Sequence, residues 1–252
     1  TANINFLSNG FQLAVTSANT GINGASTTYS YLAIAADPDQ TDPTVENSFS
    51  PILWSGSGSA RSITGLGFKP DLVWWKARNA SNYNWKAVDS INGPTKNLYN
   101  NLTNSLATDV ATTSFDDDGF TFGSGGNGNV SGLNYVGYAW KAGDHDDSIP
   151  QINTEGTIQS IVSVNDAAGF SILKYTGNEQ ASQTVGHGLS SSPQIAIVKQ
   201  LDGGRDWTVL LFTETSGDYM HLNSTQAKAT DTNKWSAVSS TTFTVGADPY
   251  TN

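Results

Sequence analysis

The sequence has no cysteine, few charges and no long apolar run, and each absence excludes a class of protein. Without cysteine the chain forms no disulfide, no thiolate zinc site and no cysteine nucleophile. Charged residues make up 13% of the 252 residues, against about 25% in average soluble domains. Acidic residues outnumber basic ones by 22 to 12, so we expect no nucleic-acid binding, which requires basic stripes.

Segments for targeting or membrane insertion are also missing from the sequence. No apolar stretch approaches the ~18 residues that a membrane-spanning helix needs, so we expect no membrane insertion. The sequence opens on Thr1 without an initiator methionine or a signal peptide. We expect from this start that the chain begins inside a domain, as a processed product or as a segment of a longer polypeptide.

The residues that are abundant indicate β-structure. Glycine occurs 25 times, and aromatic residues reach 10%, with seven tryptophans. Short β-branched and aromatic runs alternate with Gly/Ser/Asn/Asp clusters, which is typical of many short strands joined by tight turns. A helical turn is considered only near Thr103–Thr108. The composition therefore predicts an all-β fold.

The middle of the chain contains enough strands for a complete sandwich domain. Turn signals separate them, and Asp118-Gly119 between apolar stretches predicts a hairpin. About eight short strands in about 95 residues suit two packed antiparallel sheets. The strands are expected near 51–54, 60–64, 71–77, 84–89, 96–99, 112–116, 119–123 and 134–141.

The chain repeats this pattern. The stretch 49–76 matches 170–199, and Gly65-Leu66-Gly67 corresponds to Gly186-His187-Gly188. Further matches are Trp54 with Tyr175, Pro70 with Pro193, Lys76 with Lys199, Trp85 with Trp207, Asn101 with Asn223, and the stretch 119–123 with 242–246. The sequence therefore predicts tandem antiparallel β-sandwich domains.

The repeats are not all complete. Residues 5–13 resemble 114–122, and 28–35 resemble the last strand of the middle repeat, at 134–141. We therefore predict three pieces: 1–37 as the C-terminal strands of a repeat, 48–143 as a complete repeat, and 160–252 as a second repeat without its last strands. Polar, proline-containing linkers join the pieces.

Several phrases resemble a domain repeated in tail-fibre and other appendage proteins of marine and cyanobacterial phages. They include GFKPDLVWWK, SFDDDGFTFG, NYVGYAWKAG, VGHGLSSSPQIAIVK, DWTVLLF and LNSTQAKATDTNKW. The resemblance covers nearly the whole chain. It implies a lectin-like or jelly-roll-like β-sandwich, a virion or extracellular location, and structural and adhesive roles without a characterised catalytic activity.

An incomplete repeat exposes an apolar face and unpaired strand edges, which need a cover. Residues 1–37 are the right kind of piece to complete 160–252. They could do so within one chain, or between chains by strand complementation. A third route is that the chain belongs to a longer polypeptide carrying further repeats.

Metal and catalytic sites find little support in the sequence. Asp116, Asp117 and Asp118 offer the oxygen ligands that Ca²⁺ prefers, but a solvated hairpin turn explains them as well, so no cofactor is expected. The three histidines, His145, His187 and His221, are not accompanied by a G-x-S-x-G elbow. Glutamate is rare, and none falls at matched positions, which disfavours a paired-carboxylate glycosidase.

The tryptophans are the candidate contact residues. Trp85 and Trp207 are matched between the repeats, which favours the core for both. Trp74 and Trp75 are consecutive in a strand and must point to opposite faces, so one is expected to be exposed or covered by a partner domain. We predict that Trp75, together with Tyr83, forms the surface contact.

These observations lead to a hypothesis of function. The leading one is a non-enzymatic virion appendage protein of the tail-fibre or spike kind that adheres to host-surface glycans. Its partners would be copies of itself, other virion proteins and a host glycan. The alternative is a self-assembling extracellular or capsid-associated filament subunit completed by strand exchange, and the third is a polysaccharide depolymerase.

Overall fold

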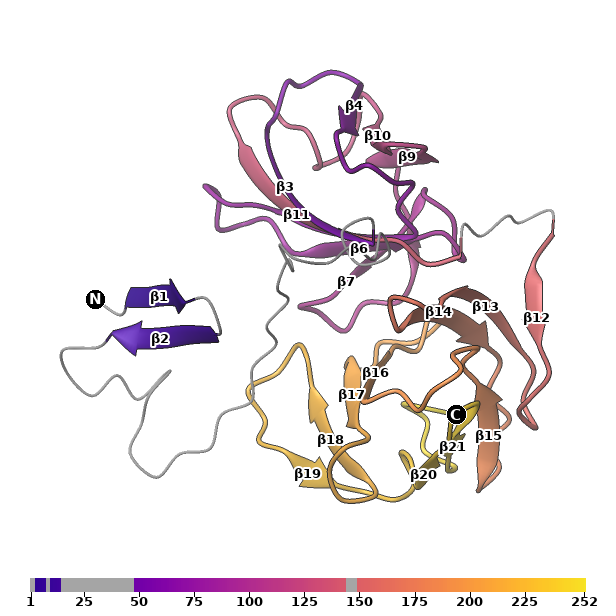
Figure 1. Cartoon of the computed structure of the whole chain (residues 1–252). Helices are drawn as coiled ribbons and strands as arrows, with labels where there is room; N and C mark the ends of the chain where they lie inside the picture. Colours follow the sequence, from indigo (N-terminus) through magenta and orange to yellow (C-terminus); the bar gives the residue numbers. More distant parts are fainter. Residues whose placement is uncertain (1–2, 8–9, 15–47, 144–148) are drawn as a thin grey trace. The chain divides into compact units, whose positions relative to one another are not determined.

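The computed structural model describes residues 3–7, 10–14, 48–143 and 149–252 (Figure 1). The chain divides into two compact units, 1–38 and 39–252. The described part of the smaller unit is one hairpin, β1 (Asn3–Leu7) with β2 (Gly10–Ala14). The described residues contain no helix, and every ladder between the named strands is antiparallel. The predicted all-β sandwich fold is confirmed.

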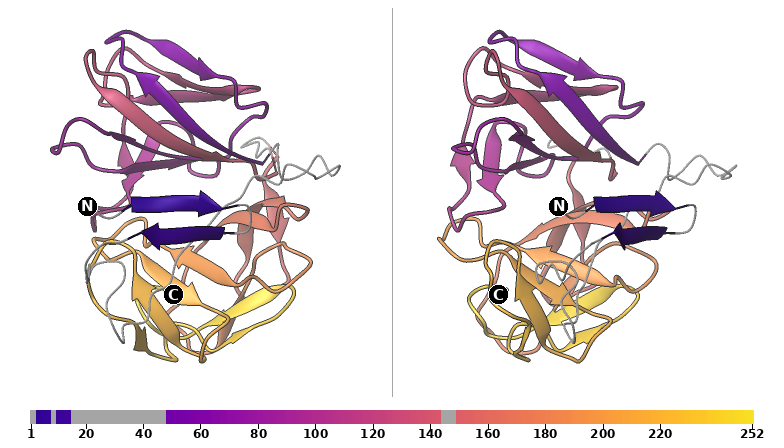
Figure 2. Two further views of the ribbon diagram at one scale, coloured as in Figure 1. Left: turned by 60° about the vertical axis from the view of Figure 1, so that its left-hand side comes forward. Right: turned by 90° about the vertical axis from the view of Figure 1, so that its left-hand side faces the viewer.

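The first repeat, residues 48–143, is a two-layer sandwich (Figure 2). One layer has the strand order β3-β11-β5-β6-β7-β8, and the other has the order β4-β10-β9. The strands of the first layer are β3 (Phe49–Ser55), β5 (Leu72–Ala77), β6 (Lys86–Asp89), β7 (Lys96–Tyr99), β8 (Ala107–Thr108) and β11 (Asn134–Trp140). Those of the second layer are β4 (Arg61–Thr64), β9 (Thr112–Asp116) and β10 (Gly119–Phe122).

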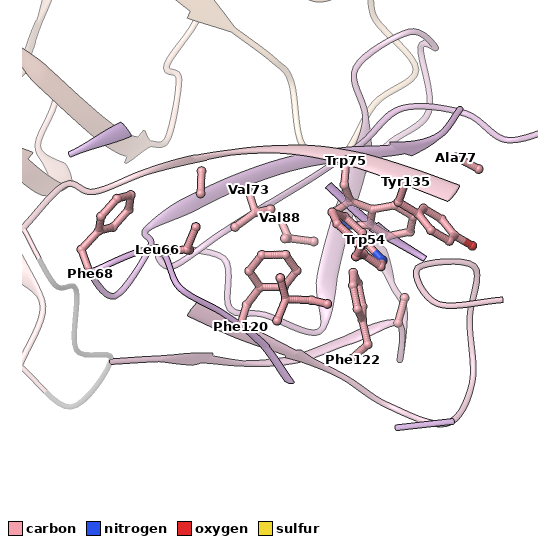
Figure 3. Close-up of a cluster of buried hydrophobic side chains, with 13 residues drawn as sticks. Trp54, Leu66, Phe68, Val73, Trp75, Ala77, Val88, Phe120, Phe122 and Tyr135 are labelled. Carbon is pink, nitrogen blue, oxygen red and sulfur yellow. The ribbon is translucent and has the colours of Figure 1, made fainter. Parts of the chain in front are cut away.

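The two layers of the first repeat meet in an aromatic core (Figure 3). Strand alternation directs every second side chain inward, so β5 alternates half-buried and buried residues along its whole length. Trp54 of β3 lies parallel to Tyr135 of β11 at a centroid distance of 5.2 Å. Phe122 of β10 meets Trp54 at 5.5 Å and so joins the second layer to the first.

The second repeat follows the first strand by strand up to β21. Two further strands, β12 (Gln151–Asn153) and β13 (Ser160–Asn165), precede its equivalent of β3. The strands equivalent to β3–β10 are, in order, β14 (Phe170–Tyr175), β15 (Gln183–Gly186), β16 (Ile195–Val198), β17 (Thr208–Leu211), β18 (Asp218–His221), β19 (Ala229–Thr230), β20 (Ala237–Val238) and β21 (Thr242–Val245). Among the described residues no strand stands in the place of β11.

The hairpin predicted from Asp118-Gly119 occurs between β9 and β10. Asp116 pairs with Gly119, so the two-residue loop is Asp117-Asp118 and Gly119 is the first residue of β10. Glycine is required there because a Cβ would lie 1.8 Å from the carbonyl oxygen of Ile63. The region considered for a helical turn, near 103–108, instead contains the short strand β8.

The small hairpin has the same register as its relative in the first repeat. Phe6 pairs with Phe11 in the β1–β2 hairpin, as Phe115 pairs with Phe120 in the β9–β10 hairpin. The remaining residues of the predicted N-terminal piece, 15–37, lie outside the described residues.

Within the larger unit the two repeats contact each other through side chains of both. Trp207 is 7% exposed, packs with Ala87 and Leu98, and donates its indole N–H to the carbonyl of Tyr99 at 2.9 Å. The Ser163 hydroxyl lies 3.1 Å from the carboxylate of Asp71, which is itself buried. The repeats are therefore joined by a buried apolar contact and by buried hydrogen bonds.

Candidate binding surface

Trp75 does not form the predicted surface contact. The side chain is 1% exposed and lies in the core, edge-on to Phe122 at 5.5 Å and to Tyr135 at 6.1 Å (Figure 3). The inward direction follows from strand parity, since Val73 and Ala77 on the same strand are also buried. The expectation for Trp75 is therefore wrong, and its bulk fills the sandwich interior.

Its neighbour Trp74 points to the opposite face, as the sequence predicts. The ring meets Trp140 at 5.3 Å and packs against the cluster that contains Trp207 of the second repeat. A partner repeat therefore covers the outward tryptophan. Tyr83, the second predicted contact residue, is half-buried and packs against the core of the first repeat.

Sequence reasoning missed Trp85 as a surface residue. Its ring is half-buried and stacks on Tyr138 at 5.9 Å with an interplanar angle of 19°. The match to Trp207 favoured a core position for both, but Trp207 is buried because it packs against the first repeat. A match between the repeats shows that two residues occupy equivalent places in the fold. Whether each residue is exposed depends on the neighbouring segments that pack against it.

Trp85 borders a surface hollow of about 440 Å³ at the end of β5. The name "Trp85 hollow" is used below for this depression. Its wall combines one aromatic ring with cationic, amide and hydroxyl side chains. The lining residues are Lys76, Ala77, Arg78, Asn79, Ala80, Ser81, Trp85 and Val136.

Hydrogen bonds hold the loop that forms the hollow. Asn79 donates to the carbonyl of Gly132 at 3.2 Å and accepts from the backbone N–H of Asn134 at 2.8 Å. The backbone N–H of Trp85 donates to the side-chain oxygen of Asn101 at 3.0 Å. The loop is thereby fixed at both ends, which leaves exposed Arg78 free to face solvent at the rim.

The aspartate run has a structural role at two of its three positions. Asp118 accepts from the backbone N–H groups of Gly65 and Gly67 at 2.9 and 2.7 Å, and these bonds lower its pKa. Asp116 accepts from the hydroxyls of Ser114 and Thr121. Within the described part of the chain no group of three or more His, Asp or Glu side chains is placed to hold a metal ion.

His187 lies in the core rather than in a catalytic arrangement. It is 3% exposed, its Nε2 lies 3.3 Å from the carbonyl of Ser239, and its Nδ1 accepts from the backbone N–H of Leu189. Burial lowers the pKa of its imidazole. The equivalent residue Leu66 is also buried, so both repeats use this place for packing. His145 lies outside the described residues.

The fold and surface define a two-repeat, all-β sandwich protein with a surface hollow bordered by Trp85. The chain belongs to a family of unknown function, because the family model described as "Domain of unknown function (DUF7483)" matches residues 45–252. This match covers both repeats. Neither a curated protein nor a solved structure matches the chain. No helix among the described residues is long and apolar enough to cross a membrane.

Proposed function

We propose that the chain is a non-enzymatic structural part of a virion appendage of the tail-fibre kind, which adheres to host-surface glycans. The observation that carries the adhesive part is the Trp85 hollow. Glycan sites combine an aromatic side chain, which contacts the apolar face of a sugar, with a few polar groups that bind hydroxyls. Trp85, Lys76 and Arg78 supply this combination within one depression.

The structural part of the proposal is supported by the way the repeats are joined. Two copies of one sandwich share a buried contact at Trp207, which suits a rod-like series of repeated modules better than flexibly tethered domains. Repetition also raises avidity, because several weak glycan contacts act together along one appendage. The extracellular or virion location is part of the same proposal.

A glycan array tests the adhesive function directly. We expect the chain to bind a subset of bacterial surface glycans and Trp85→Ala to lose that binding. Arg78→Ala should weaken binding about tenfold, the usual effect of losing one charged hydrogen bond. Arg61→Ala is the matched control, since Arg61 is also exposed on the first repeat but lies outside the hollow.

The same preparation tests the alternatives. Binding that is unchanged in Trp85→Ala, or an array without any bound glycan, contradicts adhesion at this hollow. Release of reducing ends from host polysaccharide contradicts the non-enzymatic assignment and favours a depolymerase. The filament alternative is favoured by one specific observation: among the described residues, β14 and β16 of the second repeat each pair on one edge alone.

A further inference from the structure

The Trp85 hollow contains two cationic side chains, although the chain as a whole has a net charge of −10. Lys76 is half-buried on β5, and Arg78 is exposed just beyond the end of that strand. The backbone N–H of Arg78 still donates to the carbonyl of Asn134 at 2.6 Å, so pairing with β11 extends to this residue. Strand alternation therefore places both cations on the outer face of the larger layer.

Acidic residues are missing around these two cations. Among the described residues, no acid lines the hollow. The stretch 72–88 contains three basic residues and no aspartate or glutamate, and neither β11 nor β3 contains an acid. The acid that precedes this stretch, Asp71, is buried at the opposite end of β5 and accepts hydrogen bonds there. The hollow is therefore a positively charged place on an acidic chain.

Neither cation is paired within the described part of the chain. The Lys76 ammonium and the Arg78 guanidinium make no hydrogen bond and no ion pair there. Two cations on the same face of a strand repel each other, and a half-buried ammonium has lost part of its hydration. An anionic group from outside the chain would reduce both costs.

The second repeat shows what a lysine at this position binds. Lys199 is the counterpart of Lys76. Its ammonium donates to three carbonyl oxygens, those of Gln200, Gly203 and Thr103, at 2.8, 3.0 and 3.3 Å. The position thus allows the ammonium to bind several oxygen atoms at once. In the first repeat, the described part of the chain supplies none of them.

The loop that follows the lysine also differs in charge between the repeats. In the second repeat, the loop 200–206 contains two aspartates. Desolvation lowers the pKa of Lys199, and the charges of Asp206 and Asp202 act against this lowering. In the first repeat, the loop 77–84 contains one arginine and no acid. The first repeat therefore has the lysine without the internal counter-charge.

Apolar side chains flank the two cations. By the register of the larger layer, Lys76 lies opposite Val136, and Val136 lies opposite Leu53, which is 64% exposed. Trp85 directly precedes β6, which pairs with β5 on the opposite side. The hollow thus combines apolar surface with positive charge. An acidic sugar has the complementary combination, an apolar ring face and an anionic group.

We propose that the Trp85 hollow binds a sugar that carries an anionic group, a carboxylate or a sulfate, within a surface polysaccharide. The anionic group lies between the Lys76 ammonium and the Arg78 guanidinium, whose planar fork binds two oxygen atoms at once. The apolar face of the sugar lies against the Trp85 ring. This inference rests on the proposed adhesion at the hollow and adds the class of glycan.

Titration calorimetry with the full chain tests the charge of the glycan. One probe is an oligogalacturonate, and its neutral counterpart has each carboxylate reduced to a primary alcohol. The other probe is a sulfated galactan oligosaccharide, with its desulfated form as the counterpart. We expect an anionic probe to bind at least about tenfold more tightly than its neutral counterpart, and the probe that does so identifies the group. The affinity should fall as salt is added.

Matched variants locate the binding within the hollow. Lys76→Gln and Arg78→Gln should each weaken binding of the anionic probe about tenfold and leave binding of its neutral counterpart unchanged. Arg61→Gln is the control, because it removes the same charge from the same repeat at a residue outside the hollow. This control should bind the anionic probe as the unsubstituted chain does.

The possible failures are distinguishable. Anionic and neutral probes that bind equally tightly, with both lost in Trp85→Ala, overturn the anionic class while adhesion at the hollow stands. Equal weakening by Arg61→Gln and Arg78→Gln also overturns the inference, because net charge rather than the hollow then explains the binding. If no probe binds and no glycan of the array binds, adhesion itself is contradicted, and this inference is overturned with it.

Discussion

At the scale of single residues, the tryptophans show how far sequence reasoning reaches. Strand parity alone shows that Trp74 and Trp75 point to opposite faces, and the structure agrees. Parity cannot say which face is the interior. The interior face of β5 is the one that β10 covers. The covering residues Phe120 and Phe122 lie over the Trp75 face and come from a distant part of the sequence.

Replacing Trp75 tests its assignment to the core. Trp75→Ala should lower the free energy of unfolding by about 3–5 kcal/mol, since it leaves a large cavity among packed aromatic rings. Trp85→Ala is the comparison, with a loss of about 1 kcal/mol from its stacking on Tyr138. Urea denaturation followed by circular dichroism measures both, and equal losses would contradict the burial assigned to Trp75.

Asp118 should make stability depend on acid pH. Hydrogen bonds from Gly67 and Gly65 lower the pKa of its carboxyl in the folded protein. The stabilisation is therefore present above the unfolded pKa of about 3.9 and is lost as the pH falls through the folded value. Asp118→Asn should lower Tm at pH 7 and reduce the acid dependence of Tm. Asp117→Asn, at the exposed neighbouring turn position, should change neither.

The buried His187 should make the folded protein less stable at acid pH. Burial lowers its pKa, so the unfolded chain takes up a proton near pH 6.5 before the folded chain does. Stability is then lost as the pH falls from about 6.5 toward the folded value. His187→Leu, the residue that the first repeat uses at this place, should hold Tm more nearly constant between pH 7 and 5. An unchanged slope would contradict the burial of a neutral imidazole.

At the scale of elements, most strands could be predicted because turn residues mark their ends. The strand predicted near 134–141 occurs as β11 at 134–140, and those predicted near 71–77 and 96–99 occur as β5 and β7. The two-residue strand β8 escaped prediction because a stretch that short has no periodicity. The β9–β10 hairpin lies between the strands predicted near 112–116 and 119–123, and Gly119 is the first residue of β10, where it makes a close contact with the backbone of Ile63.

Gly119 gives a test of that close contact. Gly119→Ala should lower the free energy of unfolding by about 1–3 kcal/mol, because the added methyl would force β10 away from the carbonyl of Ile63. Gly132→Ala is a useful comparison, since a Cβ there meets nothing within 4 Å and only its positive φ is strained. If Gly119→Ala lowers the free energy of unfolding no more than Gly132→Ala does, the close contact between β4 and β10 does not contribute to stability, which would contradict this prediction.

At the scale of the whole molecule, the sequence could predict the repetition but not the surfaces that it leaves open. The matches between 49–76 and 170–199 indicated two sandwiches, and equivalent strands follow in the same order in both. The Trp85 hollow was not predictable, because it depends on a loop at the end of β5 and on the packing of Tyr138.

Glycan binding by two matched variants tests the central claim of adhesion at the Trp85 hollow most directly. The account predicts that Arg61→Ala keeps the bound glycan and that Trp85→Ala loses it, since Trp85 lines the hollow and Arg61 does not. Equal binding by the two variants would contradict it.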